Sequence, residues 1–244
     1  MKNSTFWDEN PETVDLVMLA LKEMSNNKKK KSNIYSIENI KFFIESLISE
    51  DDIKLIQYTE KLFNDETEYE IFFEKFIPEV AEDLGNSWKK DELTFVEVSL
   101  ATSRLQKLCK VFEKKYLGPL FLETLGPDIL LILPKNETHS LAPIVASGIL
   151  KKVGSNPFLA IGYDDKELIE LVKNKNFKII GFSITNSKNI SECLKLGRLL
   201  KKNVKDDVHF VLGGQGTKNL NNQYGNNFFS LITSNPKEIL ALIN

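Results

Sequence analysis

The spacing of hydrophobic positions changes its period near residue 117. Between residues 36 and 117 apolar side chains recur three and four positions apart, which is typical of amphipathic helices. We predict one helix that begins at residue 36 and three more over 51–63, 72–88 and 93–116. The core-facing stripe of the last helix is predicted to comprise Phe95, Val98, Leu100, Leu105, Leu108 and Val111. Residues 36–117 are therefore expected to form a helical bundle.

Beyond residue 128 short apolar runs alternate with helical segments. Strands are predicted over 129–133, 158–161, 179–183, 208–212 and 228–232, and helices over 141–153, 165–174, 190–202, 218–223 and 236–243. This order predicts an α/β domain over 128–244 with a five-stranded, parallel, doubly wound sheet of the flavodoxin or Rossmann-like type. The connection 117–128 holds Gly118-Pro119 and Gly126-Pro127, two helix- and strand-breaking pairs, and we place the domain boundary there.

Residues 1–35 form a polar N-terminal tail. We expect a short helix over residues 11–24, followed by the run Lys28 to Lys31 among asparagines and serines. This run is interpreted as a solvated linker, with a phosphate-binding patch as the alternative.

Composition narrows the possible functions. The 244 residues are 42% hydrophobic with a formal net charge of −2, so a substantial core is expected and direct nucleic-acid binding is disfavoured. Cys109 and Cys193 fall far apart within helical patterns, which favours buried thiols over a disulfide or a metal site. The chain has no apolar run of 18 residues and no signal-peptide core at its polar start, so we expect a cytoplasmic protein without a membrane span.

Three predicted strand ends carry residues suited to binding a ligand. Glu137 and His139 follow the first strand, Ser183 and Thr185 end the third, and Gly213-Gly214 follows the fourth. The carboxyl ends of parallel strands share one edge of the sheet, so these residues are expected to converge. Imidazole is a common metal ligand, a carboxylate can fix its tautomer, and glycines allow a ligand close to the backbone. Each has a plainer alternative: a polar loop residue, a serine bonded to backbone, and a tight turn.

Other common site motifs are missing from the sequence. It has no G-x-G-x-x-G after the first strand, no G-x-S-x-G and no clustered Cys and His residues. A dinucleotide site, a serine hydrolase site and a zinc site are therefore not predicted.

The three strand ends together resemble the cobalamin-binding domains, whose signature is D-x-H-x-x-G, then S-x-L or S-x-T, then G-G. Here these stretches are E-T-H-S-L-A (137–142), S-I-T (183–185) and G-G (213–214). The resemblance implies that cobalamin is the cofactor, that His139 is its lower cobalt ligand and that Glu137 orients this histidine. It also implies cofactor contacts from the rest of the loop, Ser140, Leu141 and Ala142. A slot for the nucleotide tail would be lined by Ser183, Thr185, Gly213 and Gly214.

The helical half contributes to the same resemblance, which covers roughly residues 60–235. The stretches 84–88 and 93–99 look like the helices that cap the corrin ring, with Trp88 and Val98 at its upper face; Trp88 is equally suited to a core position. The segment F-V-E-V-S-L-A-T-S-R-L-Q is similar to a helix of the cobalamin- or haem-sensing regulators of photosynthesis genes in purple bacteria.

The sequence departs from these families at three positions. Glu137 replaces aspartate, Ala142 replaces glycine, and Val98-Ser99 stands where light-dependent repressors carry Glu-His. An upper-face histidine from this helix is therefore missing. If the tail slot exists, Gly214→Val is expected to block it without altering the fold.

From this resemblance we expect a cobalamin-binding sensor rather than an enzyme, with light or redox state as its signal. The sequence has no helix-turn-helix pattern that we can identify. Its output is expected to pass through a partner, such as a DNA-binding transcription factor or another regulatory protein, and a homo-oligomer is compatible with this role. A corrinoid methyl-carrier protein that works with a methyltransferase is one alternative, and a haem-binding sensor or ligand-free interaction module is another.

Overall fold

The computed structural model describes residues 37–49, 51–63, 66–118, 126–218, 220 and 228–243. The polar tail, its expected helix and its lysine run lie outside the described residues, as does most of the helix expected over 218–223. Within the described part, every helix is too short or too polar to cross a bilayer.

The N-terminal half is a bundle of helices, called the cap below. Its elements are α2 (Ile37–Ser49), α3 (Asp52–Leu62), α4 (Glu66–Ile71), the π-helical segment η1 (Phe72–Phe76), α5 (Ile77–Lys89) and α6 (Phe95–Leu117). The predicted helix over 72–88 thus begins earlier, at Glu66, and contains a π-helical stretch. Aromatic side chains fill the centre, with Phe72 and Phe76 each packed against Phe63. The predicted helical bundle is confirmed.

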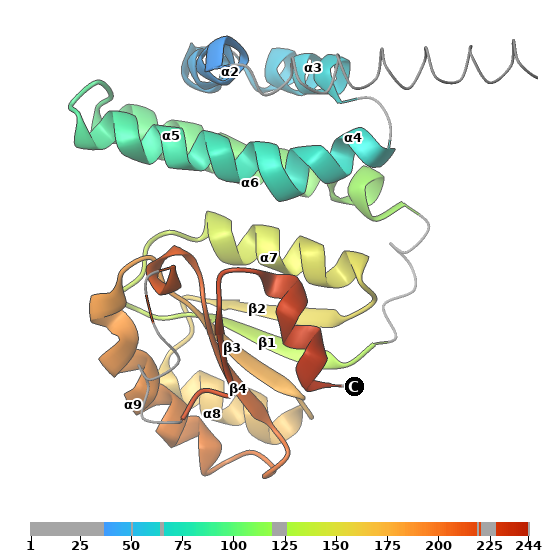
Figure 1. The fold of residues 1–244 in the computed structure, drawn as a ribbon, viewed down its shortest axis with the longest axis vertical. Coiled ribbons are helices and arrows are strands. Elements are labelled where there is room, and N and C mark those ends of the chain that lie inside the picture. The colour runs from blue at the N-terminus through green and yellow to red at the C-terminus, as the bar shows by residue number, and fades with distance from the viewer. Residues whose placement is uncertain are drawn as a thin grey trace, which may run out of the picture.

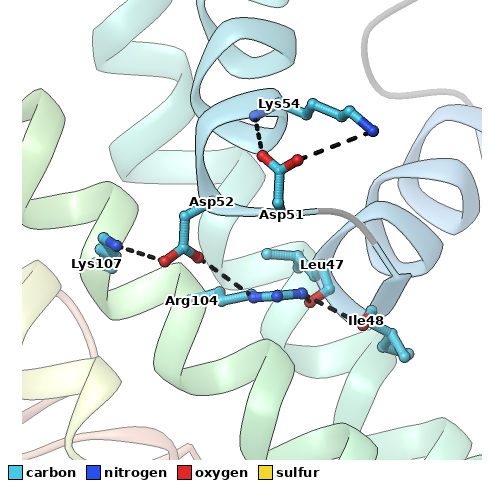
Figure 2. Close-up of polar contacts among 7 residues, drawn as sticks. All are labelled: Leu47, Ile48, Asp51, Asp52, Lys54, Arg104 and Lys107. Carbon is cyan, nitrogen blue, oxygen red and sulfur yellow. Dashed lines mark hydrogen bonds and ion pairs between the residues drawn. The ribbon is translucent and has the colours of Figure 1, made fainter.

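Hydrogen bonds and ion pairs join α2 and α3 to α6 (Figure 2). Arg104 of α6 donates through Nη1 to the backbone oxygens of Leu47 (2.7 Å) and Ile48 (3.3 Å), near the C-terminal end of α2. Its Nε lies 3.4 Å from Oδ1 of Asp52, whose other oxygen pairs with Lys107. The last carbonyls of a helix lack partners within the helix, so Arg104 satisfies groups that α2 leaves open.

The C-terminal half is a five-stranded parallel sheet in the order β2-β1-β3-β4-β5, the flavodoxin-like order. Its strands are β1 (Asp128–Leu133), β2 (Asn156–Ile161), β3 (Ile179–Ser183), β4 (His209–Gly213) and β5 (Leu231–Thr233). Helix α7 (Leu141–Lys152) and the 3-10 segment η5 (Pro236–Leu242) cover one face, and α8 (Asp165–Asn174) and α9 (Ile190–Lys201) cover the other (Figure 1). The predicted doubly wound fold is confirmed, although the last predicted helix is a 3-10 helix.

Helix α7 lies between the cap and the sheet (Figure 1). Leu141, Val145 and Ile149 belong to the buried cluster of the cap, whereas Leu150 belongs to the cluster on the sheet face. One helix therefore contributes to two cores, and it fixes the cap above the edge of the sheet where the strands end.

The predicted core stripe of α6 is correct only in part. Leu105 and Leu108 are buried, but Phe95 is 71% exposed, and Leu100 (38%) and Val111 (42%) are also exposed. The first turn of α6 extends past the cap core: Thr94 begins the helix with a capping box, in which Glu97 N donates to Thr94 Oγ1 and Thr94 N donates to the Glu97 carboxylate.

Candidate functional site

A cavity of about 1020 Å³ lies between the cap and the carboxyl edge of the sheet. Its upper wall comes from α5 and α6, its lower walls from the loop after β1, from α7, from the ends of β3 and β4, and from the segment after β5. This volume is at the upper end of the range for small-molecule sites, which is about 300–1,000 Å³. The cavity is large enough for a sizeable cofactor.

The loop after β1 presents one side chain to the cavity and buries another. The His139 side chain is 63% exposed and lies on the cavity wall, whereas the Glu137 side chain is only 2% exposed. The loop starts with a turn that ends at Glu137, whose backbone amide donates to Pro134 O at 2.9 Å. The loop thus places an accessible imidazole above a buried carboxylate.

The Glu137 carboxylate is held by the segment that follows β3. It accepts hydrogen bonds from Thr185 N (2.9 Å), Thr185 Oγ1 (2.6 Å) and Asn189 Nδ2 (2.7 Å). Burial alone would raise the pKa of Glu137, but the bonds from Thr185, Asn189 and two backbone amides outweigh burial and lower this pKa. Glu137 is therefore ionised at neutral pH.

Thr185 links this carboxylate to the ring of His139. The Thr185 hydroxyl donates its proton to Glu137, so its oxygen acts as an acceptor on the other side. His139 Nδ1 lies 3.4 Å from that oxygen and 4.0 Å from Glu137 Oε2. Because both neighbours of Nδ1 are acceptors, we assign the ring proton to Nδ1, which leaves the lone pair of Nε2 free to bind a metal.

The sheet contributes small residues to the cavity floor. The register aligns Gly181 with Leu131 and Val211, and Ser183 with Gly213, and all five residues line the cavity. Paired residues of neighbouring strands point to the same face. Because two of the five lack a side chain, the cavity extends down toward the face of the sheet.

Gly214 has a structural role that overturns one expectation. Its φ is 97°, and a Cβ atom there would lie 2.3 Å from the backbone oxygen of Ile184. In addition, Gly216 N donates to that oxygen at 3.0 Å. The loops after β3 and β4 are therefore in direct backbone contact. The expectation that Gly214→Val would leave the fold intact is wrong, because the added side chain would force these loops apart.

Most of the predicted site residues meet at this cavity. Those that line it are Trp88, Val98, His139, Leu141, Ala142, Ser183, Thr185, Gly213 and Gly214. Trp88 is 47% exposed, so it is a wall residue and not a core residue. Glu137 lies behind His139, and Ser140 accepts a hydrogen bond from Gln106 Nε2 of α6 at 2.9 Å.

Sequence reasoning missed the cavity face of α5 and the C-terminal wall. Pro78, Ala81 and Gly85 line the cavity from α5, and a Cβ atom on Gly85 would meet nothing within 4 Å. Their spacing of three and four residues places these small residues on one helical face, which was a usable signal. Asn235 and Pro236 after β5 carried no comparable signal.

The donor set limits which metals this site could hold. Within the described residues no group of three or more His, Cys, Asp or Glu side chains could hold a metal ion. A single accessible imidazole is instead suited to a metal whose other coordination positions are filled by a macrocycle. The residues present therefore fit a corrinoid or a haem better than a free ion.

No protein-family model matches the sequence. The uncharacterized 20.5 kDa protein in the bchF-crtJ intergenic region of Rhodobacter capsulatus is 25% identical over 139 residues, which are 57% of this chain and 72% of that protein. The monomethylamine corrinoid protein of Methanosarcina barkeri has a TM-score of 0.63 at 12% identity, over 82% of this chain and 95% of that chain. This chain has the fold of a corrinoid protein. A cobalamin-binding protein from Desulfitobacterium hafniense DCB-2 gives a TM-score of 0.43 at 14% identity, over 85% of this chain and 100% of that chain.

The resemblance drawn from the three strand ends is thus confirmed for the fold. The assignment of individual residues to a cofactor stays a prediction.

Proposed function

We propose that the cavity binds a corrinoid, most simply cobalamin, with Nε2 of His139 as the protein ligand to cobalt. The observation that carries this proposal is the hydrogen bonding of His139. Its accessible ring faces the cavity, and Nδ1 faces two acceptors, Thr185 Oγ1 and the Glu137 carboxylate. This arrangement orients the imidazole for metal coordination through Nε2 before any ligand arrives.

The other walls suit the remaining parts of such a cofactor. Trp88, Phe95 and Val98 offer an apolar surface on the cap side, and the small residues Gly181 and Gly213 leave room on the sheet side. When bound, cobalamin would supply a cobalt centre whose exchangeable ligand responds to light or redox state. The protein's own residues bind it, orient His139 and shield the cap side from water.

We propose a regulatory role rather than an enzymatic one. The loop that carries His139 is linked to the cap, because Ser140 accepts a hydrogen bond from Gln106 of α6. A shift of this loop on coordination would therefore reach α6 directly. The similarity of the α6 sequence to light- or redox-sensing regulators supports the same role. Its output would pass through a partner protein, such as a DNA-binding transcription factor.

A corrinoid methyl-carrier protein is the second candidate, and the fold supports it about as well. The similarity to the monomethylamine corrinoid protein favours this role. Its partner would be a methyltransferase, and methyl transfer to the bound corrinoid in the presence of that enzyme would distinguish a carrier from a sensor.

Titration of the purified apo-protein with hydroxocobalamin and adenosylcobalamin, in darkness and in light, tests the proposal. His139→Ala is expected to lose the absorption bands of imidazole coordination and about 10- to 100-fold in affinity. The matched control is His209→Ala, because His209 lies at the opposite end of β4, where its Nδ1 contacts Ser230. Equal spectra and affinities for the two variants would exclude His139 as the ligand. A Soret band in the purified protein would favour haem instead.

A further inference from the structure

We propose that a row of hydrogen-bonding side chains on α6, called the polar row below, recognises amide groups on the edge of the bound ligand. The row comprises Ser99, Thr102, Ser103 and Gln106, and all four residues line the cavity. The inference rests on the proposed function, because a corrin ring carries acetamide and propionamide groups around its edge, whereas a haem carries propionates. The polar row would therefore favour the corrin ring over the haem.

The polar row occupies one face of α6. Thr102 and Ser103 follow Ser99 by three and four positions, and Gln106 follows them by four and three. This spacing places all four side chains on the same side of a helix. Leu105 lies on another face and is buried in the cap core. The helix thus separates an apolar face that packs in the cap from a polar face that is presented to the cavity.

The hydroxyl groups of the polar row are available to a ligand. A serine or threonine in a helix can donate its hydroxyl proton to the carbonyl four residues earlier. In the cap, Ser46, Ser49 and Thr59 do so at 2.8, 2.7 and 2.8 Å. Among the described residues, the hydroxyls of the polar row have no hydrogen-bond partner. They can therefore both donate to and accept from a molecule in the cavity.

Gln106 adds an acceptor whose orientation is fixed by the protein. Its Nε2 donates to Ser140 Oγ at 2.9 Å, which leaves Oε1 to accept from a ligand. A primary amide has both an NH2 donor and a carbonyl acceptor, so it can bind Gln106 Oε1 and a hydroxyl of the polar row together. A carboxylate only accepts, and it would leave Gln106 Oε1 without a donor.

The charged groups of the cavity wall are paired with each other. Lys218 Nζ lies 3.7 Å from Glu82 Oε2, and Lys237 Nζ lies 2.7 Å from Glu74 Oε2. Within the described part of the chain, these four side chains and His139 are the titratable groups of the wall, and no arginine lines it. A propionate would therefore enter beside two carboxylates without a free cation to receive it.

Titration of the full-length protein with hydroxocobalamin and with its monocarboxylic acids tests the inference. In each of these acids one propionamide on the ring edge is replaced by a propionate, while the cobalt and the nucleotide tail are unchanged. We expect at least one acid to bind about 10-fold more weakly than hydroxocobalamin, because an amide contact is lost and a charge is desolvated. Equal affinities for hydroxocobalamin and all the acids would overturn the inference.

Thr102→Val/Ser103→Ala removes two hydroxyls of the polar row with little change in volume. The affinity for hydroxocobalamin is expected to fall about 10-fold. The unfolding free energy of the apo-protein should not fall, because these hydroxyls have no partner among the described residues. The matched control, Ser46→Ala/Ser49→Ala, removes two helical hydroxyls outside the cavity and should keep the affinity. An unchanged affinity in the first variant, or an equal loss in the control, would contradict the role of the polar row.

Glu82→Gln tests the contribution of charge, because it leaves Lys218 free to receive a carboxylate. The affinity of at least one monocarboxylic acid, relative to hydroxocobalamin, should rise about two- to fivefold. Unchanged ratios for all the acids would refute the role of the paired charges. If hydroxocobalamin itself does not bind, the proposed function fails and this inference fails with it. If it binds and its amide groups can be replaced without loss, only the inference fails.

Discussion

Replacing Glu137 with glutamine is expected to reverse the hydrogen bonding of His139 at nearly constant side-chain volume. The glutamine oxygen can still accept from Thr185 N and Asn189 Nδ2, as Glu137 Oε1 does now. Its NH2 group would take the place of Oε2 and donate to Thr185 Oγ1. The Thr185 proton is then free to turn toward His139 Nδ1, which would move the ring proton to Nε2 and block coordination.

The size of this effect follows from the contacts that change. The hydrogen bonds from Thr185 N and Asn189 Nδ2 keep an acceptor oxygen, but this oxygen no longer carries a charge. The hydrogen bond between Thr185 Oγ1 and the residue at position 137 changes direction. Hydrogen bonds to a charged group contribute about 1.5–3 kcal/mol and neutral ones about 0.5–1.5 kcal/mol, so we expect a loss of about 1–2 kcal/mol in the free energy of unfolding. Loss of the orienting contact should weaken corrinoid binding about 10- to 100-fold, or about 1.4–2.8 kcal/mol.

Urea unfolding and corrinoid titration would measure both quantities. Hydrogen bonding lowers the pKa of Glu137 below its ordinary value of 4.5, so its contribution to stability is present above pH 4.5 and is lost as the pH falls through the lowered pKa. The stability difference between the two proteins should therefore shrink in acid. Glu167→Gln is the control, because this carboxylate accepts one bond from Asp164 N at the start of α8. Unchanged coordination spectra in Glu137→Gln would refute the proposed control of the His139 ring proton by Glu137 through Thr185.

Three further predictions concern stability and reactivity. Gly214→Ala should lower the free energy of unfolding in urea by about 3 kcal/mol, because its Cβ would lie 2.3 Å from a backbone oxygen. Gly85→Ala lies in open space within α5 and should raise this free energy by about 1 kcal/mol. Equal effects of the two substitutions would contradict this reasoning. Burial raises the pKa values of Cys109 and Cys193 to about 12, so iodoacetamide should label neither thiol at neutral pH until urea unfolds the chain, and rapid native labelling would contradict their burial. Arg104→Met should lower the unfolding free energy by about 2 kcal/mol, because two α2 carbonyls lose their donor; an unchanged melting temperature would show that water replaces it.

The α/β domain could be predicted from the sequence because its signals are local. Each strand is a short apolar run between turn residues, and β3 has the predicted bounds, Ile179–Ser183. The prediction of the last strand was less accurate. The apolar run starts at Phe228, but Phe228 and Phe229 pack as side chains against Phe210 and Phe182 before β5 begins at Leu231. A hydrophobic pattern reports burial and does not distinguish strand pairing from packing.

Most residues of the candidate site could be predicted from the sequence, but the contacts between distant ones could not. His139 and Glu137 share one loop, so their spacing was readable. The contacts of Glu137 with Thr185 and Asn189 join positions 48 and 52 residues apart. The sequence placed Thr185 near the site because it ends a neighbouring strand, but it gave no reason to assign Thr185 the bridging role. Asn189 was not predicted at all, because an asparagine at a helix start is ordinarily explained by capping.

The error on α6 is informative about function. A helix that lines a ligand cavity needs apolar residues for the same reason as a helix that packs in a core, so the sequence pattern cannot separate the two surfaces. In the structure Leu105 and Leu108 are buried, while Phe95, at the start of α6, is 71% exposed and lines the cavity, as Trp88 does. While Phe95 and Trp88 are exposed to water, the protein lacks the stabilisation that their burial would give, about 25 cal/mol for each Å² of apolar surface. Their position on a cavity wall, facing the end of the molecule that carries His139, is accounted for if a large ligand with an apolar face covers them when it binds.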